Sequence, residues 1–183
     1  MKFDVHTIDT APAEARPTLE GVKKAYGFVP NLFGVFAESP AAAEAYASIG
    51  KALEKAALDP VEQQVVFLSV SAQNACSYCV AAHSTIARGV KMPDGALAAL
   101  RSQEPLSDER LQALAEFTRA VVSHRGWVPD EALSAFSAAG FERRHVLDVL
   151  TIIAMKTLSN YTNHIAETPL DDAFADQAWE GQA

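Results

Sequence analysis

Helix start and stop signals recur along the whole chain and constrain its fold more than any other feature. Ser39-Pro40 and Asp59-Pro60 each place a capping side chain directly before a proline, as many helices begin. Glu62 stands three residues after Asp59, in the position that completes a capping box. Sustained alternation of apolar and polar residues with β-branched enrichment is missing from the sequence. The pattern therefore predicts an all-α fold of about seven to nine helices.

The boundaries of these helices follow from the prolines, glycines and capping residues. We expect helices over 17–26, from near 30, over 40–58, 60–73 and 76–88, from 93, from a cap at Ser107, over 129–139 and over 142–164. The helix over 60–73 is apolar almost all round, so it should be buried. The last long helix carries "VLDVLTIIAMKTL" and is expected to be central.

The chain is expected to form one domain. Its 183 residues are 49% hydrophobic, which is enough to bury a core. We find no internal repeat and no linker rich in glycine, serine or proline. The domain should span 1–183, with an N-terminal arm over about 1–15 and a C-terminal tail over about 167–183. We expect the acidic tail to be a solvated loop that clasps a neighbouring subunit through Phe174 and Trp179.

The charge and hydropathy of the chain exclude some partners. A net charge of −8 repels phosphate backbones, so nucleic acid is not expected to bind. The sequence has no apolar run long enough to span a bilayer, and its start lacks a stretch of signal-peptide type. We therefore expect a cytoplasmic protein without membrane partners, in which a structural disulfide is a poor explanation for two close cysteines.

Both cysteines of the chain lie in "NACSYCVAAHS", residues 74–84. On a helix, Cys76 and Cys79 are one turn apart, and His83 lies one further turn along the same face. The break at Asn74 places Cys76 near a helix N-terminus, where unpaired amides favour a thiolate. Such a thiolate can attack an oxidant, form a sulfenic acid and be resolved by a second thiol. The motif predicts thiol-based redox chemistry.

Two other interpretations of the cysteines stay open at this point. Buried cysteines can be small core residues with no chemistry. Zinc could use Cys76, Cys79 and His83, but a closed site needs a fourth ligand, for which His164 is the candidate. We favour the redox interpretation and expect neither a metal nor another cofactor.

The motif Cys-X-X-Cys-X-X-X-His resembles that of the alkylhydroperoxidase D-like, peroxidase-related branch of the carboxymuconolactone decarboxylase superfamily. The similarity extends over most of the chain, through "YGFVPNLFGVFAESP", "DPVEQQVVFLSVSAQNACSYC" and "TLSNYTNHIAETPLDDAF". The resemblance implies an all-helical subunit that assembles as a homotrimer, or as a hexamer built from trimers. It also implies that the site lies near a subunit interface.

The resemblance further implies reduction of hydroperoxides through the two cysteines. Cys79 would be the peroxidatic thiol, Cys76 the resolving thiol, and His83 part of the proton relay that activates Cys79. An external thiol reductant of dihydrolipoyl or thioredoxin-like type would complete the cycle.

This sequence departs from the family pattern at two positions. The family relay uses a glutamate twelve residues before the first cysteine, where this chain has Gln64. Glu62 is nearby, but two residues turn about 200° around a helix, so Glu62 should not replace it. Tyr78 stands where the best-characterised members have a histidine, and His164 is a further candidate for the pocket or an interface. Losing a general base typically costs about 10² to 10⁴ in rate, so weak activity is expected.

Two other classes of function remain as alternatives. One is a non-redox decarboxylase or lactone-processing enzyme of the same superfamily, against which the motif argues because that branch lacks the cysteine pair. The other is a non-enzymatic oxidant sensor or metal-binding protein that uses the same pocket.

Overall fold

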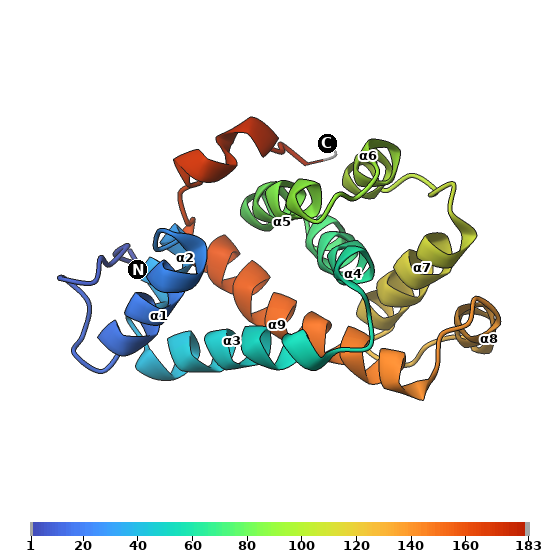
Figure 1. Cartoon of the computed structure of the whole chain (residues 1–183), viewed down its shortest axis with the longest axis horizontal. Helices are drawn as coiled ribbons and strands as arrows, with labels where there is room; N and C mark the ends of the chain where they lie inside the picture. The colour runs from blue at the N-terminus through green and yellow to red at the C-terminus, as the bar shows by residue number, and fades with distance from the viewer. Residues whose placement is uncertain (1, 182–183) are drawn as a thin grey trace.

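A computed structural model describes residues 2–181 of the chain, and over these residues the structure is all-helical, without a strand (Figure 1). The all-α prediction is therefore confirmed. The helices are α1 (Arg16–Tyr26), α2 (Asn31–Phe36), α3 (Pro40–Ala52), the 3-10 helix η1 (Leu53–Lys55), α4 (Pro60–Gln73), α5 (Ser77–Gly89), α6 (Asp94–Ser102), α7 (Glu109–Ser123), α8 (Asp130–Ala138), α9 (Arg143–Ala166) and the 3-10 helix η2 (Asp172–Gln177). Within this part of the chain, no helix is both long and apolar enough to cross a membrane.

Helix α4 is the centre of the fold. It packs against α5, α6, α7 and α9, and Figure 1 shows it between α5 and the long α9. Its buried side chains include Val65, Val66 and Leu68, none of which exposes any surface. Each such side chain contributes about 1.5–3 kcal/mol when it leaves water. The expectation of a buried helix here is confirmed.

The start of α4 is stabilised by the predicted capping box. The Glu62 amide donates to Oδ1 of Asp59 at 2.8 Å, and the Asp59 amide donates to Oε2 of Glu62 at 2.9 Å. Oε1 of Glu62 also accepts a hydrogen bond from Nε of Arg110 on α7 at 2.8 Å. Glu62 therefore joins α4 to α7 besides capping its own helix.

Two predicted helix boundaries are wrong. Helix α3 ends at Ala52 and continues only as the short η1, because the last residues before Asp59 leave the helix. Helix α7 is capped by Asp108 rather than by Ser107, since Oδ1 of Asp108 accepts the Leu111 amide at 2.9 Å. Both residue types are good caps, so the sequence alone did not separate the two neighbours.

The C-terminal segment is not a solvated arm. Residues 172–177 form η2, which packs on α5. The Phe174 ring is buried, with its centroid 6.1 Å from that of Tyr78 and 5.9 Å from that of Phe28. Nε1 of Trp179 donates to the Arg101 carbonyl at 3.1 Å. The prediction is wrong over 167–181 because these aromatic side chains bury against the same chain; residues 182 and 183 of the predicted tail lie outside the described part.

The N-terminal arm, described from residue 2, packs on α2. The His6 amide donates to the Gly34 carbonyl at 3.1 Å. A Cβ at Gly34 would come within 2.7 Å of the His6 carbonyl oxygen, so only glycine permits this approach.

The turn from α4 to α5 is a Schellman motif that places the first cysteine. The Cys76 amide donates to the Ser71 carbonyl at 2.9 Å and the Ala75 amide to the Ala72 carbonyl at 3.0 Å. Ala75 takes a left-handed conformation with φ of 52°, where glycine is the usual residue. Cys76 is then the N-cap residue of α5.

We expect Ala75→Gly to raise the free energy of unfolding by up to about 1 kcal/mol, because glycine relieves the left-handed strain of alanine. Urea denaturation measures the change. The matched control is Ala45→Gly on the exposed face of α3, where the same replacement should lower stability by about 0.5–1 kcal/mol. A destabilised Ala75→Gly protein would contradict this account of the turn.

Candidate active site

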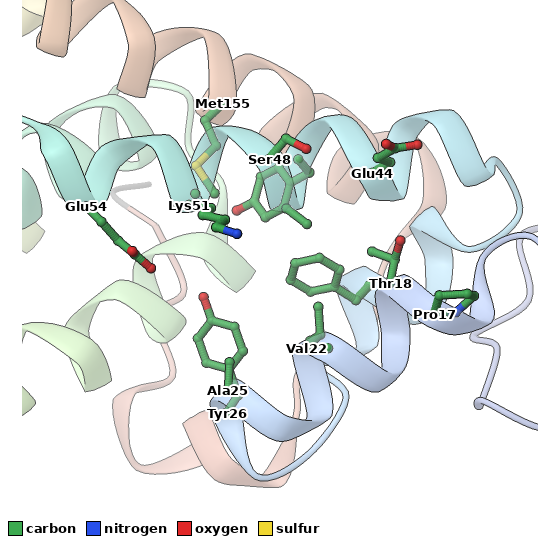
Figure 2. Close-up of a pocket in the computed structure, with 15 residues that line it drawn as sticks. Pro17, Thr18, Val22, Ala25, Tyr26, Glu44, Ser48, Lys51, Glu54 and Met155 are labelled. Carbon is green, nitrogen blue, oxygen red and sulfur yellow. The ribbon is translucent and has the colours of Figure 1, made fainter.

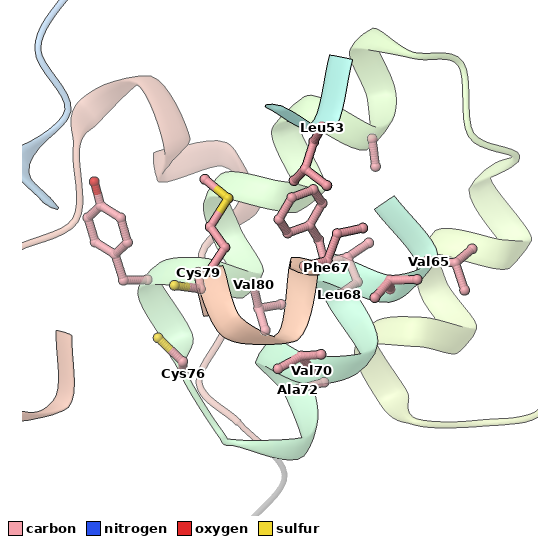
Figure 3. Close-up of a cluster of buried hydrophobic side chains, with 14 of the residues drawn as sticks. Leu53, Val65, Phe67, Leu68, Val70, Ala72, Cys76, Cys79 and Val80 are labelled. Atoms are coloured by element: carbon pink, nitrogen blue, oxygen red, sulfur yellow. The ribbon is translucent and has the colours of Figure 1, made fainter. Parts of the chain in front are cut away.

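Cys76 and Cys79 lie at the start of α5, inside the protein. Both are free thiols, and each exposes 1% of its surface. Figure 3 shows the two sulfur atoms on α5 beside the buried cluster that includes Phe67 and Val80. The two thiols therefore share one environment that is largely shielded from water.

Helix α9 presents a row of polar side chains to these thiols. Nδ2 of Asn163 donates to Sγ of Cys79 at 3.2 Å and lies 3.8 Å from Sγ of Cys76. Oγ of Ser159 lies 3.9 Å from Sγ of Cys79. Lys156 is one turn earlier on the same face of α9, fully buried and within reach of Cys79. Polar groups on the buried face of α9 thus converge on one sulfur.

The two thiols differ in acidity. Burial acts to raise the pKa of Cys79, but a hydrogen bond from Cys76 and the charge of Lys156 outweigh it and hold that pKa well below its ordinary value. The pKa of Cys76 is raised, because this thiol donates its hydrogen to Cys79 and is itself buried. Cys79 is therefore the thiolate of the pair and Cys76 the thiol.

His83 has a different neighbourhood from the thiols. Its Nδ1 lies 3.0 Å from Oε1 of Gln64, and its ring stacks on Phe67 with centroids 4.3 Å apart. Burial and the charge of Lys156 hold the pKa of His83 well below its ordinary value, so the ring is neutral. The neutral ring donates its hydrogen from Nδ1 to the side-chain oxygen Oε1 of Gln64, so Nε2 is left as a hydrogen-bond acceptor. Among residues 2–181, no hydrogen bond joins His83 to either cysteine.

The other predicted site residues are spread over the structure. The Tyr78 hydroxyl donates to Asp171 and accepts the Leu32 amide at 3.3 Å, so it ties α5 to α2 and the C-terminal segment. Glu62 is occupied by its cap and by Arg110, as the helical geometry predicted. His164 is exposed in the last turn of α9, away from the thiols.

Lys156 and Ser159 were not predicted from the sequence, whereas Asn163 was considered only beside His164, as a residue of the pocket or an interface. A signal for Lys156 was present, since this lysine directly follows the largely apolar run "TIIAM" in a helix that was expected to be central. A lysine at such a position is almost never buried without a partner. Ser159 and Asn163 carry no comparable signal, because small polar residues are common on exposed helix faces.

A cavity of about 280 Å³ is lined in part by residues of α5, although neither cysteine is among its lining residues. Its walls are mostly aromatic and apolar, and its polar groups include Gln64 and His83. Tyr46 connects it to the thiols, because this residue lines the cavity while its hydroxyl hydrogen-bonds Ser159. The phenyl and phenol rings in the wall are those of Tyr26, Phe28, Phe33, Tyr46, Phe67, Tyr78 and Phe174.

A second hollow of about 510 Å³ opens between α1 and α3 (Figure 2). Figure 2 shows Tyr26 on α1 facing Lys51 of α3 across it. The two hollows share Tyr26, Tyr46 and Met155 in their walls, so they adjoin each other.

The described part of the chain contains no cluster of side chains that would support the zinc interpretation. Over residues 2–181, no group of three or more histidine, cysteine or acidic side chains is placed to hold a metal ion. His83 is turned toward Gln64, and His164 is exposed.

Comparisons with known proteins agree with this architecture. A family model of the carboxymuconolactone decarboxylase family matches residues 40–126. A peroxidase-related protein from Ralstonia eutropha JMP134, described as an alkylhydroperoxidase AhpD core, is 26% identical over 94% of this chain and 93% of its own, with a TM-score of 0.82. A comparison with curated proteins found no match.

Two further solved structures share the fold. A peroxidase-related protein from Silicibacter sp. TM1040 is 18% identical over 97% of this chain and 94% of its own, with a TM-score of 0.80. The debrominase Bmp8, in complex with 2,3,4-tribromopyrrole, is 17% identical over 90% of this chain and 89% of its own, with a TM-score of 0.75. The chain thus has the all-helical architecture of these solved structures. Part of its sequence matches the carboxymuconolactone decarboxylase family, and over 94% of its length the chain is similar to a peroxidase-related protein with an AhpD core.

We expect the reduced protein to keep a thiolate well below the pH at which cysteine ordinarily titrates. The pKa of Cys79 is depressed, so the ultraviolet absorbance of the thiolate should persist as the pH falls and disappear only below that lowered pKa. Cys79→Ser should abolish this absorbance, whereas Cys76→Ser retains a donor to Cys79 and should keep it. A wild-type titration near the ordinary value of about 8.5 would contradict the assignment.

Proposed function

We propose that this protein is a thiol-dependent peroxidase, or disulfide oxidoreductase, that reduces hydroperoxides through Cys76 and Cys79. The observation that carries the proposal is the asymmetry of the pair: a thiolate at Cys79 beside a protonated thiol at Cys76, one turn apart. A nucleophile and a resolving thiol are the two components that such chemistry needs. Similarity to a peroxidase-related protein with an AhpD core supports the same conclusion.

The reaction runs in two steps on these sulfur atoms. The Cys79 thiolate attacks the terminal oxygen of the hydroperoxide, the O–O bond breaks, and the alkoxide leaves with a proton as an alcohol. Cys79 is then a sulfenic acid. The Cys76 thiol attacks it, so that a disulfide forms and water leaves. An external dithiol reduces the disulfide and returns two hydrogens to the site.

The cavity suits an organic hydroperoxide with a small apolar body. Aromatic walls favour an apolar chain or ring, and few polar groups are present to orient it. Nε2 of His83 can accept the hydroxyl hydrogen of the peroxide, because Nδ1 is engaged with Gln64. In this proposal Gln64 fixes the ring of His83, whereas the family glutamate would take part in proton transfer.

We expect wild type to consume an organic hydroperoxide in the presence of a dihydrolipoyl or thioredoxin-like donor, and to form an intramolecular disulfide when the donor is omitted. Cys79→Ser should abolish consumption, because no thiolate remains. Cys76→Ser should allow one turnover and then accumulate the sulfenic acid. Peroxide consumption and mass spectrometry measure these outcomes. Equal rates for Cys79→Ser and wild type would reject the proposal.

The same assays separate the alternatives. Turnover of a carboxylactone by the double cysteine-to-serine variant would favour the non-redox decarboxylase. Oxidation of both thiols without turnover in the presence of a dithiol would favour an oxidant sensor.

A second candidate activity is reductive debromination of a small aromatic ring. The aromatic cavity of about 280 Å³ favours it, because a flat ring stacks well on such walls. Oxidation of the two thiols to a disulfide supplies the two electrons that replace bromine by hydrogen and release bromide. The debrominase Bmp8 shares this fold, and bromide release from 2,3,4-tribromopyrrole is the corresponding assay.

We also propose that the protein is a homotrimer, or a hexamer built from two trimers. The outer face of α9 supports self-association, because Leu147, Leu150, Tyr161 and Ile165 are exposed there by 41–70%. At 100° per residue these four side chains fall within about 60° of the helix circumference, in a stripe about 27 Å long. Apolar stripes of this kind mark interaction surfaces.

We expect sedimentation to give a mass of three or six times 19.6 kDa for wild type. Leu147→Glu with Ile165→Glu should lower the mass, because the charges would need to be buried in the interface. The matched control is Lys51→Glu with Lys55→Glu on the exposed surface of α3 and η1. A monomeric wild type would reject the proposed assembly.

A further inference from the structure

Lys156 is a buried cation without a carboxylate partner. It exposes 0% of its surface, and its Nζ lies 5.9 Å from the centroid of the Phe67 ring. None of the ion pairs formed within residues 2–181 includes Lys156. An ammonium removed from water without compensation costs several kcal/mol, so a nearby anion must balance it.

Only one group around Lys156 can be that anion. The titratable side chains that face it are Cys76, Cys79 and His83 on α5 and Tyr46 on α3, while α4 contributes the Phe67 ring. Burial raises the pKa of Tyr46, and its hydrogen bond to Cys79 raises the pKa of Cys76, so both stay neutral. Cys79 is left as the counter-ion.

Peroxide reduction removes this counter-ion. When the Cys79 thiolate attacks an oxygen atom, its negative charge passes to the departing alkoxide. Lys156 would then be a charged group in a closed apolar site with no partner, while the alkoxide, a strong base, needs a proton. A single proton transfer from Nζ of Lys156 removes both charges.

We propose that Lys156 is both the counter-ion of the Cys79 thiolate and the general acid that protonates the leaving alkoxide. This inference rests on the proposed hydroperoxide reduction. In the first step the hydroperoxide reacts with the Cys79 thiolate and the Lys156 ammonium. The products are a sulfenic acid at Cys79, a neutral amine at Lys156 and an alcohol. Attack by the Cys76 thiol then gives the disulfide and water. A dithiol donor finally returns one hydrogen to Cys76 and one proton to Lys156, so the site has no net charge at any stage.

The proposal explains how the site works without the family glutamate. Gln64 cannot ionise, and the His83 that it holds is neutral and donates its only N–H hydrogen to that amide. Neither residue can therefore supply a proton to the alkoxide. Lys156 approaches the same sulfur from α9 and carries the proton that the step requires.

Two variants of Lys156 separate its two roles. Lys156→Met removes the charge, so the thiolate absorbance at neutral pH should be lost and hydroperoxide reduction should slow. Lys156→Arg keeps the charge but cannot be deprotonated, so the thiolate should remain. Its hydroperoxide reduction should slow by about 10² to 10⁴. Its alkylation by iodoacetamide needs no acid, because iodide leaves as an anion, and should stay close to wild type. Lys55→Met, at an exposed lysine of η1, is the matched control.

A measurement on wild type makes the test independent of whether the variants fold. Stoichiometric hydrogen peroxide is added to the reduced protein in weak buffer with a pH indicator. We expect no net proton uptake, because Lys156 supplies the proton. If Lys156 stays charged, one proton is taken up from solution for each disulfide formed, which would overturn the proposal.

The outcomes also distinguish this inference from the proposed function. A wild type that reduces hydroperoxide together with an equally active Lys156→Arg would reject the role of Lys156 alone. A wild type that reduces no hydroperoxide at all would reject the proposed function, and the role of Lys156 with it.

Discussion

The attraction between the Cys79 sulfur and the Lys156 ammonium is the interaction on which the site depends. It lies where α4, α5 and α9 meet, in surroundings of low polarity that strengthen electrostatic attraction and penalise any unpaired charge. The hydrogen bonds from Asn163 and Cys76 to the same sulfur also stabilise the buried negative charge of the thiolate. Without these partners, burial would favour the neutral thiol, and the pKa of Cys79 would rise rather than fall.

The rest of the fold holds these groups in place. The buried helix α4 separates α5 from α7 and ends in the turn that presents Cys76. The C-terminal segment folds back on α5, where Phe174 and the Tyr78–Asp171 hydrogen bond close one wall of the cavity. The helix that carries the acidic thiol therefore also forms part of the wall of an apolar cavity. The lowered pKa of Cys79 beside the Lys156 ammonium is what distinguishes a reactive cysteine from one that only packs in the core.

Sequence reasoning succeeded where the relevant interactions are local. Asp59 and Glu62 lie within one helical turn, so their capping box and the failure of Glu62 to substitute for Gln64 follow from helix geometry alone. It failed where a local rule competes with long-range packing. The tail was expected in solvent because of its acidic residues, yet the burial of Phe174 and the hydrogen bond of Trp179 to Arg101 decide its position.

The sequence by itself determined that the chain is helical, that both cysteines lie one turn apart at a helix start, and that Gln64 cannot ionise. These properties depend on residues within a few positions of one another. Only the tertiary structure decided which cysteine is acidic. Lys156 and Asn163 lie about 80 residues away along the chain, and no periodicity or motif links them to Cys79. A thiol's pKa is set by the charges and donors around it in space, and folding alone brings them together.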